Sequence, residues 1–160
     1  MKIIELSRGM SAKVSDKDFI YLNKFSWYAH HGHSSNLWYA RTDWQLNGKH
    51  KHVFMHVLLA ERIGIKHVDH MDGNGLNNQR SNLREADNRQ NSSNKKLYIN
   101  NKTGYKGVFW RADRCHYKVT ISANGHTIYI GSSKDKIEAA KMYNKAAKKY
   151  HGKFARLNKL

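Results

Sequence analysis

The sequence has a single cysteine, no proline and few acidic residues. The one cysteine, Cys115, excludes an intramolecular disulfide and any zinc site built from several cysteines. We have no functional explanation for the absence of proline. The start, MKIIELSRGM, lacks the apolar core of a signal peptide, and no apolar run approaches the length that spans a bilayer. We therefore expect an intracellular protein without a membrane partner.

Positive charge dominates the composition. The chain has 12 Asp and Glu against 29 Lys and Arg, a formal net charge of +17 and a pI near 10.0. A hydrophobic content of 39% with a mean hydropathy of −0.82 indicates a globular chain with small cores and a large polar surface. Such an excess of charge suits a polyanionic partner, of which a nucleic-acid backbone is the commonest.

The patterning predicts an α+β chain of four segments. These are a small β-rich module at 1–55, a finger of two strands and a helix at 56–95, a basic linker at 96–102, and a three-stranded antiparallel sheet packed on one helix at 103–160. In the first module, Leu37–Leu46 alternates, with Trp38, Ala40, Thr42, Trp44 and Leu46 on one face. Asn47 and Gly48 then predict a hairpin turn.

Three histidines, His30, His31 and His33, are expected in a loop between strands of this module. Histidines so close together can bind a metal. Spacing alone is a weak indication, however, and no carboxylate accompanies them. Both interpretations stay open.

Residues 69–91, DHMDGNGLNNQRSNLREADNRQN, hold the densest group of chemically useful side chains. The predicted order is a strand at Val68–His70, a turn at Asp72 and Gly73, a strand at Leu83–Glu85, and a helix from Asp87. This order brings Asp69, His70 and Asn91 towards one point. Consecutive residues of a regular strand point to opposite faces, so Asp69 and His70 can share a site only where that strand ends.

A simpler interpretation of the same residues is an ordinary polar loop. Asn74, Asn77 and Asn78 would then merely tolerate a left-handed backbone, and Asn82 and Asn91 would cap helices or face solvent.

The span resembles the HNH nuclease motif, the ββα-metal finger, in the variant of phage homing endonucleases. The resemblance implies that His70 is the general base, that Asp69 and Asn91 are metal ligands, and that Asn82 braces the loop, with Asp72 as a rival to Asp69. Asn91 stands where the name-giving pattern has its last histidine, so this chain reads H-N-N. Histidine titrates near neutral pH, and carboxylate and amide oxygens favour one Mg²⁺ or Mn²⁺ ion per site.

His56 begins a predicted helix at 56–63 and corresponds to a recurrent position of the same family. From the sequence it either faces the nuclease site or caps and packs the helix.

Strands at 106–111, 117–122 and 127–131, a turn at Asn124 and Gly125, and a helix capped by Asp135 are predicted in the last segment. This segment resembles the apetala-two type of DNA-binding domain, also called the ethylene-response-factor domain. The stretches GYKGV, WR, YKV, YIG and EAA carry the likeness. In that family the sheet lies in the major groove.

Residues 105–160 contain 13 Lys and Arg against three acidic residues, a balance of +10. The expected DNA contacts are Arg111, Arg114, Lys118 and Thr120, with Trp110 and Tyr129 behind them. Core packing is an equal alternative for the two aromatic residues.

These observations predict a metal-dependent HNH endonuclease that acts on double-stranded DNA in a host cytoplasm. With one site per chain, a monomer rather than a homodimer is expected to nick one strand per event, and no protein partner is evident. The alternatives are a non-catalytic, sequence-specific DNA-binding regulator that keeps the finger as a scaffold, and an RNA-binding protein.

Overall fold

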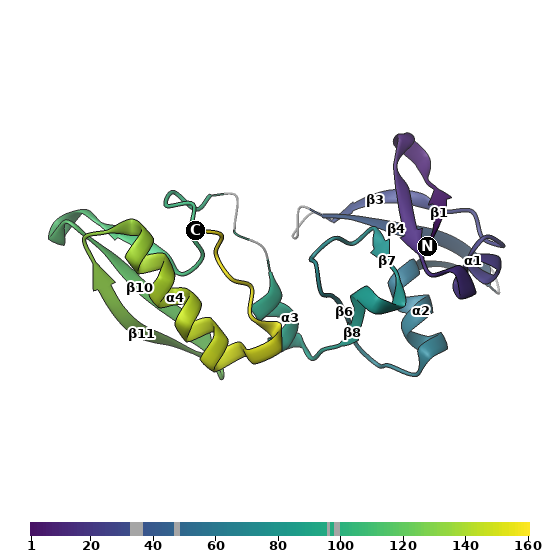
Figure 1. The fold of residues 1–160 in the computed structure, drawn as a ribbon. Helices are drawn as coiled ribbons and strands as arrows, with labels where there is room; N and C mark the ends of the chain where they lie inside the picture. Colours follow the sequence, from purple (N-terminus) through teal and green to yellow (C-terminus); the bar gives the residue numbers. More distant parts are fainter. Residues whose placement is uncertain (33–36, 47–48, 96, 98–99) are drawn as a thin grey trace. The chain divides into compact units, whose positions relative to one another are not determined.

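The computed structural model describes residues 1–32, 37–46, 49–95, 97 and 100–160. They form two compact units, residues 1–87 and residues 88–160 (Figure 1). Each unit combines helices and strands, which confirms the predicted α+β class. Within these residues, no helix is long and apolar enough to cross a membrane.

The first unit does not end near residue 55, where the sequence patterning placed a boundary. It continues through both strands of the finger, because one apolar core runs through the whole of it. Ile4 and Val14 from the beginning of the chain belong to the same buried cluster as Leu59 and Leu83. The predicted segment 56–95 is therefore divided between the units. The helix that follows its two strands belongs to the second unit.

Backbone pairing joins the beginning of the chain to the finger. Strand β1 (Lys2–Glu5) pairs with β2 (Ser11–Val14), and β2 pairs in parallel with the short strand β7 (Asn77–Asn78). Lys13 lies opposite Asn77, and Val14 lies opposite Asn78. These two asparagines are thus placed by residues more than sixty positions earlier in the sequence.

A buried ion pair makes a second connection. Asp18, on helix α1 (Asp16–Leu22), has no solvent exposure. Its carboxylate accepts hydrogen bonds of 2.7 and 2.6 Å from Nε and NH2 of Arg80, which begins the 3₁₀ helix η2 (Arg80–Asn82). Oγ of Ser15 accepts from the Arg80 amide at 2.9 Å. This bidentate geometry fixes the chain immediately before Asn82.

Strands β3 (Tyr28–Gly32), β4 (Leu37–Leu46) and β5 (Lys49–Phe54) form an antiparallel sheet. Ala40 and Thr42 are buried, and Trp38 and Trp44 pack against the core, so the predicted alternation of β4 is confirmed for these four residues. The predicted turn at Asn47 and Gly48 lies outside the described residues.

The prediction that His30 and His31 lie in a loop is wrong, because both belong to β3. His30 lies opposite Tyr39 of β4, and His31 lies opposite Trp38. As neighbours on a strand they point to opposite faces, which disfavours a shared metal ion. His33 lies outside the described residues.

Helix α2 (Met55–Ile63) follows β5 directly and buries Leu58 and Leu59 in the core of the first unit. It ends at Gly64, whose φ of 77° is the left-handed conformation that favours glycine. Strand β6 (Val68–His70) then pairs antiparallel with β8 (Leu83–Glu85). The predicted helix and both predicted strands of the finger are confirmed.

The second unit holds helix α3 (Asn88–Asn94) and the strands β9 (Val108–Arg111), β10 (His116–Ala123) and β11 (His126–Ser133), in the sheet order β11-β10-β9. Helix α4 (Lys136–His151) covers one face of this sheet (Figure 1). Oδ1 of Asp135 caps it by accepting from the amides of residues 137 and 138, as predicted. Asn124 and Gly125 both have positive φ, 54° and 83°, as a hairpin turn of the predicted type requires.

Candidate active site

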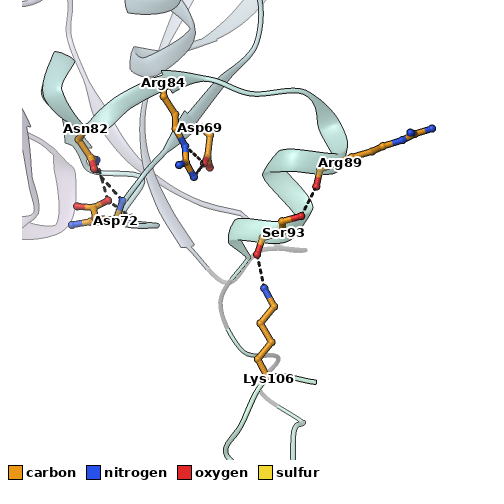
Figure 2. Close-up of polar contacts among 8 residues, drawn as sticks. Asp69, Asp72, Asn82, Arg84, Arg89, Ser93 and Lys106 are labelled. Carbon is orange, nitrogen blue, oxygen red and sulfur yellow. Dashed lines mark hydrogen bonds and ion pairs between the residues drawn. The ribbon is translucent and has the colours of Figure 1, made fainter. Parts of the chain in front are cut away.

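The pairing of β6 with β8 positions the first predicted ligand. Asp69 lies opposite Arg84, and its Oδ2 accepts hydrogen bonds from Nε at 3.0 Å and from NH2 at 2.7 Å of that residue (Figure 2). Both side chains are mostly buried, at 12% and 15% exposure. A partly buried, charge-assisted pair of this kind holds the carboxylate in one orientation.

Asn82 braces the loop that follows β6 (Figure 2). Its Oδ1 accepts from the Asp72 amide at 3.1 Å, and its Nδ2 donates to Oδ1 of Asp72 at 3.0 Å and to the Asn77 carbonyl at 2.8 Å. These three hydrogen bonds tie η2 to the loop between β6 and β7.

Asp72 closes the same loop from the other side. It accepts from the Asn74 amide at 2.8 Å and from Nδ2 of Asn77 at 2.8 Å. Desolvation tends to raise its pKa, but hydrogen bonds from Asn77, Asn74 and Asn82 prevail and hold the pKa below the usual value. Asp72 thus acts as an internal acceptor of the loop.

The asparagines of this loop do not serve to tolerate a left-handed backbone. The positive φ in it belongs to Gly73, at 68°, and not to Asn74, Asn77 or Asn78. Their side chains make hydrogen bonds instead, which is a structural use that the polar-loop interpretation did not include.

His70 ends β6 and is 7% exposed. Its Nε2 lies 3.2 Å from Oδ1 of Asn78, and Nδ2 of Asn78 donates to the Gly75 carbonyl at 3.5 Å. This orientation of the Asn78 amide is consistent with a proton on Nε2 of His70 and a basic lone pair on Nδ1. Burial lowers the pKa of His70 from 6.5, against opposing effects of Asn78, Asp72 and Asp69. The ring is therefore neutral at pH 7, as a general base must be.

Aromatic rings of other residues lie close to His70. The ring of His56 meets it edge to face, with centroids 5.0 Å apart, and Tyr39 lies 6.3 Å away. Phe54 stacks on His56 at 5.6 Å. Burial, followed by the charge of His70, lowers the pKa of His56 to about 3.

Asn91 lies on α3, in the second unit, and its Oδ1 is buried without a hydrogen-bond partner among the described residues. The C-terminal end of α3 is held by Lys106, whose Nζ donates to the Ser93 carbonyl at 2.6 Å (Figure 2) and to the Lys95 carbonyl at 2.9 Å. Burial lowers the pKa of Lys106 to about 8. Asn91 as a metal ligand stays a prediction from the sequence.

Four of the predicted DNA contacts share the outer face of the second sheet, away from α4. Thr120 pairs with Tyr129, and Nζ of Lys118 lies 6.0 Å from the Tyr129 ring. These residues alternate with buried Val119, and Arg111 is on the same side of β9 as Phe109, the partner of Lys118. Tyr129 is 59% exposed, so core packing does not apply to it.

Trp110 is placed differently. It alternates with Phe109 and so lies on the α4 side, where its ring is 4.8 Å from that of Tyr117. At 48% exposure it sits at the margin of the core. Arg114 lies in the turn η3 (Ala112–Arg114), with its side chain 72% exposed and Nε 3.7 Å from Asp113.

Three residues near His70 or on the outer face of the second sheet were not predicted from the sequence. Asn78 and Tyr39 reach His70 only through long-range pairing, and no local signal identifies them. Phe109, 49% exposed on the outer face, could have been found from strand alternation, because it is the neighbour of Val108, which is buried on the opposite face.

Two short antiparallel strands, an asparagine-braced loop, a neutral buried histidine at a strand end and a following helix together have the element order of a ββα nuclease finger. Comparison with known proteins agrees. The chain is 34% identical over 155 residues to a protein of Acanthamoeba polyphaga mimivirus named as an uncharacterized HNH endonuclease, a match that covers 96% of this chain and 77% of that protein. The chain belongs to the HNH endonuclease family.

A second relative, protein 3.8 of Escherichia phage T7, is 36% identical over 90 residues, which are 56% of this chain and 74% of that protein. No family model matches the chain, and no solved structure matches it.

Proposed function

We propose that this protein is a metal-dependent endonuclease that hydrolyses phosphodiester bonds in double-stranded DNA, with each monomer nicking one strand per event. The observation that carries the proposal is the placement of His70 at the end of β6, with Nε2 3.2 Å from Oδ1 of Asn78, next to Asp69, whose carboxylate is held by Arg84. The membership of the HNH endonuclease family supports it.

In the proposed reaction, Nδ1 of His70 takes a proton from a water molecule as the water oxygen forms a bond to phosphorus. The bond from phosphorus to the 3′ oxygen breaks, and that oxygen takes a proton from a second water molecule, which leaves a 5′ phosphate and a 3′ hydroxyl. Asn78 keeps the acceptor nitrogen directed at the water by retaining the proton on Nε2. Asn82 contributes indirectly, because it keeps the loop after His70 closed.

The donor chemistry fits one Mg²⁺ or Mn²⁺ ion. Asp69 offers a carboxylate, and Asn91 offers an amide oxygen that is buried without a partner among the described residues. A bound cation would offset the negative charge that builds on the phosphate and on the leaving oxygen. Asp69 and Asn91 belong to different units, so their assignment to one ion rests on the resemblance to the family alone.

We further propose that the second unit binds the DNA through the outer face of its sheet, as in the apetala-two type of domain. A three-stranded antiparallel sheet covered by one helix, with Lys118, Thr120, Arg111 and exposed Tyr129 on the opposite face, supports this. Cations would position the phosphate backbone, and the aromatic ring would reach a base or sugar.

The direct test is to incubate supercoiled plasmid with the protein and Mg²⁺, beside His70→Ala and EDTA controls. We expect conversion to nicked circles by the wild type only. The alternative, a non-catalytic DNA-binding regulator, predicts shifted but intact plasmid in all three samples. Competition between duplex DNA and RNA at matched salt tests the RNA-binding alternative.

A further inference from the structure

His56 carries an unused polar atom next to the proposed base. Its Nδ1 is buried and has no hydrogen-bond partner among the described residues. The ring is fixed from two sides, by stacking on Phe54 at 22° between planes and by the edge contact with His70. A buried polar nitrogen without a partner is costly, so a ring needed only for packing would be better served by phenylalanine.

The two roles that the sequence left open for His56 can now be separated. Phe54, not His56, occupies the capping position of α2, and its side chain offers no cap hydrogen bond. His56 lies in the first turn of the helix, where the backbone dipole is positive and where no acidic side chain is present. This environment favours an anion beside the ring.

The separation of the two histidines suits a phosphate group. The attacking water would lie at hydrogen-bond distance from His70 and about 3 Å from phosphorus. The centroid of the His56 ring is 5.0 Å from that of His70, so His56 would be within reach of the phosphate oxygens. The low pKa of His56, about 3, means that it stays uncharged at neutral pH and can donate one hydrogen bond without competing for the proton of the water.

We infer that His56 is a substrate-binding residue of this site, donating a hydrogen bond from Nδ1 to a non-bridging oxygen of the DNA phosphate that His70 serves. The inference rests on the proposed nuclease function. Negative charge on the phosphate oxygens increases in the transition state, so a hydrogen bond from His56 is strongest there. His56 should therefore affect the rate of cleavage more than the affinity for DNA.

Three substitutions test this with supercoiled plasmid and Mg²⁺. His56→Asn keeps an amide nitrogen near the position of Nδ1, His56→Leu has nearly the same size without it, and His56→Phe keeps the ring and its stacking. Single-turnover nicking is measured over a range of protein concentrations, which gives the maximal rate and the half-saturating concentration separately. Thermal unfolding of each variant checks that it folds.

We expect His56→Leu and His56→Phe to lower the maximal rate about a hundredfold, with a half-saturating concentration within about twofold of wild type. His56→Asn should recover at least about tenfold of that loss. Equal rates for the Asn and Leu variants, or a wild-type rate for a folded Phe variant, would overturn the inference while leaving the nuclease function in place. If the wild type nicks no more than His70→Ala, the proposed function fails, and this inference fails with it.

Discussion

Nε2 of His70 lies 3.2 Å from Oδ1 of Asn78, a residue that is completely buried and placed by the parallel pairing of β7 with β2. The orientation of the proposed base therefore depends on a strand from the beginning of the chain. Strand β2 is therefore part of the active-site scaffold, since its pairing with β7 helps to place Asn78 against the ring.

Replacing Asn78 by leucine should lower the maximal nicking rate by about 10- to 100-fold, the usual effect of removing a residue that orients a reacting group. The ring of His70 loses the acceptor that sets its tautomer. Asn74→Ala in the same loop is the matched control, because the Asn74 side chain is exposed and accepts a hydrogen bond from the Leu76 amide at 3.1 Å, away from His70. A leucine variant that folds and cleaves like wild type would show that Asn78 has no orienting role.

Acid should destabilise the protein through its uncharged histidines. The folded-state pKa of His56 is about 3, whereas the unfolded chain takes up that proton near 6.5. Between these values the unfolded state binds more protons, so the free energy of unfolding decreases as pH falls from 6.5 towards 3 and is constant above that window. From pH 7.5 to pH 5 the contribution of His56 is up to about 2 kcal/mol.

Urea unfolding of the wild type and of His56→Phe at pH 7.5 and pH 5 measures this contribution. The variant lacks the titrating ring and should lose less stability between the two pH values. An equal loss for both proteins would mean that His56 is protonated normally in the folded state.

The features that the sequence predicted correctly are local ones. Asp135 caps α4 and Asn124 with Gly125 turns the chain because the residues involved are adjacent or three apart. The arrangement around His70 is different, since Asn78 and Tyr39 reach it from two separate strands, and Phe54 stacks on the neighbouring His56 from a third. No pattern within one strand specifies which other strand it will join, so neither these contacts nor the boundary at residue 87 could be predicted.

The placement of His30 and His31 fails for a geometric reason, because pairing with β4 extends β3 to Gly32. Trp110 and Arg111 are neighbours on β9 and point to opposite faces, which puts Trp110 on the α4 side and favours the core-packing alternative for it.

Removing the buried carboxylate of Asp18 should strongly destabilise the first unit. Asp18→Asn removes the charge of a fully buried carboxylate that pairs with Arg80, and because the Arg80 side chain is 29% exposed we expect a loss at the lower end of the about 3–5 kcal/mol that breaking a buried pair costs. Asp113→Asn is a matched control, because it breaks an exposed pair with Arg111, and solvent-exposed ion pairs contribute little to stability. Urea unfolding of the two variants should separate them clearly, and similar small losses would show that the Asp18 pair is solvated.

Gly75 should not tolerate a side chain. A Cβ at this position would lie 2.5 Å from the Trp38 carbonyl oxygen and 2.5 Å from the ring of Tyr39. Gly75→Ala must displace the loop that carries Asn78, so we expect a destabilisation of about 1–3 kcal/mol together with a large loss of nicking. Gly64→Ala is the comparison, since its Cβ would meet no atom within 4 Å and it is strained only by its φ of 77°. If both variants lose stability but keep full activity, the close approach at Gly75 does not matter for the site.

The outer face of the second sheet should account for part of the salt dependence of DNA binding. Lys118→Ala removes one cation beside Tyr129, and the slope of log affinity against log salt should become shallower by about one phosphate contact. Lys141→Ala is matched in charge, but Lys141 lies on α4, where it pairs with Glu138 at 2.6 Å, and it should leave the slope unchanged. Fluorescence anisotropy of a labelled duplex at several salt concentrations measures both slopes. Because the net charge is altered equally in the two variants, a difference between them can arise only from the face that contacts the DNA, and equal slopes would argue for binding through the general charge of the protein.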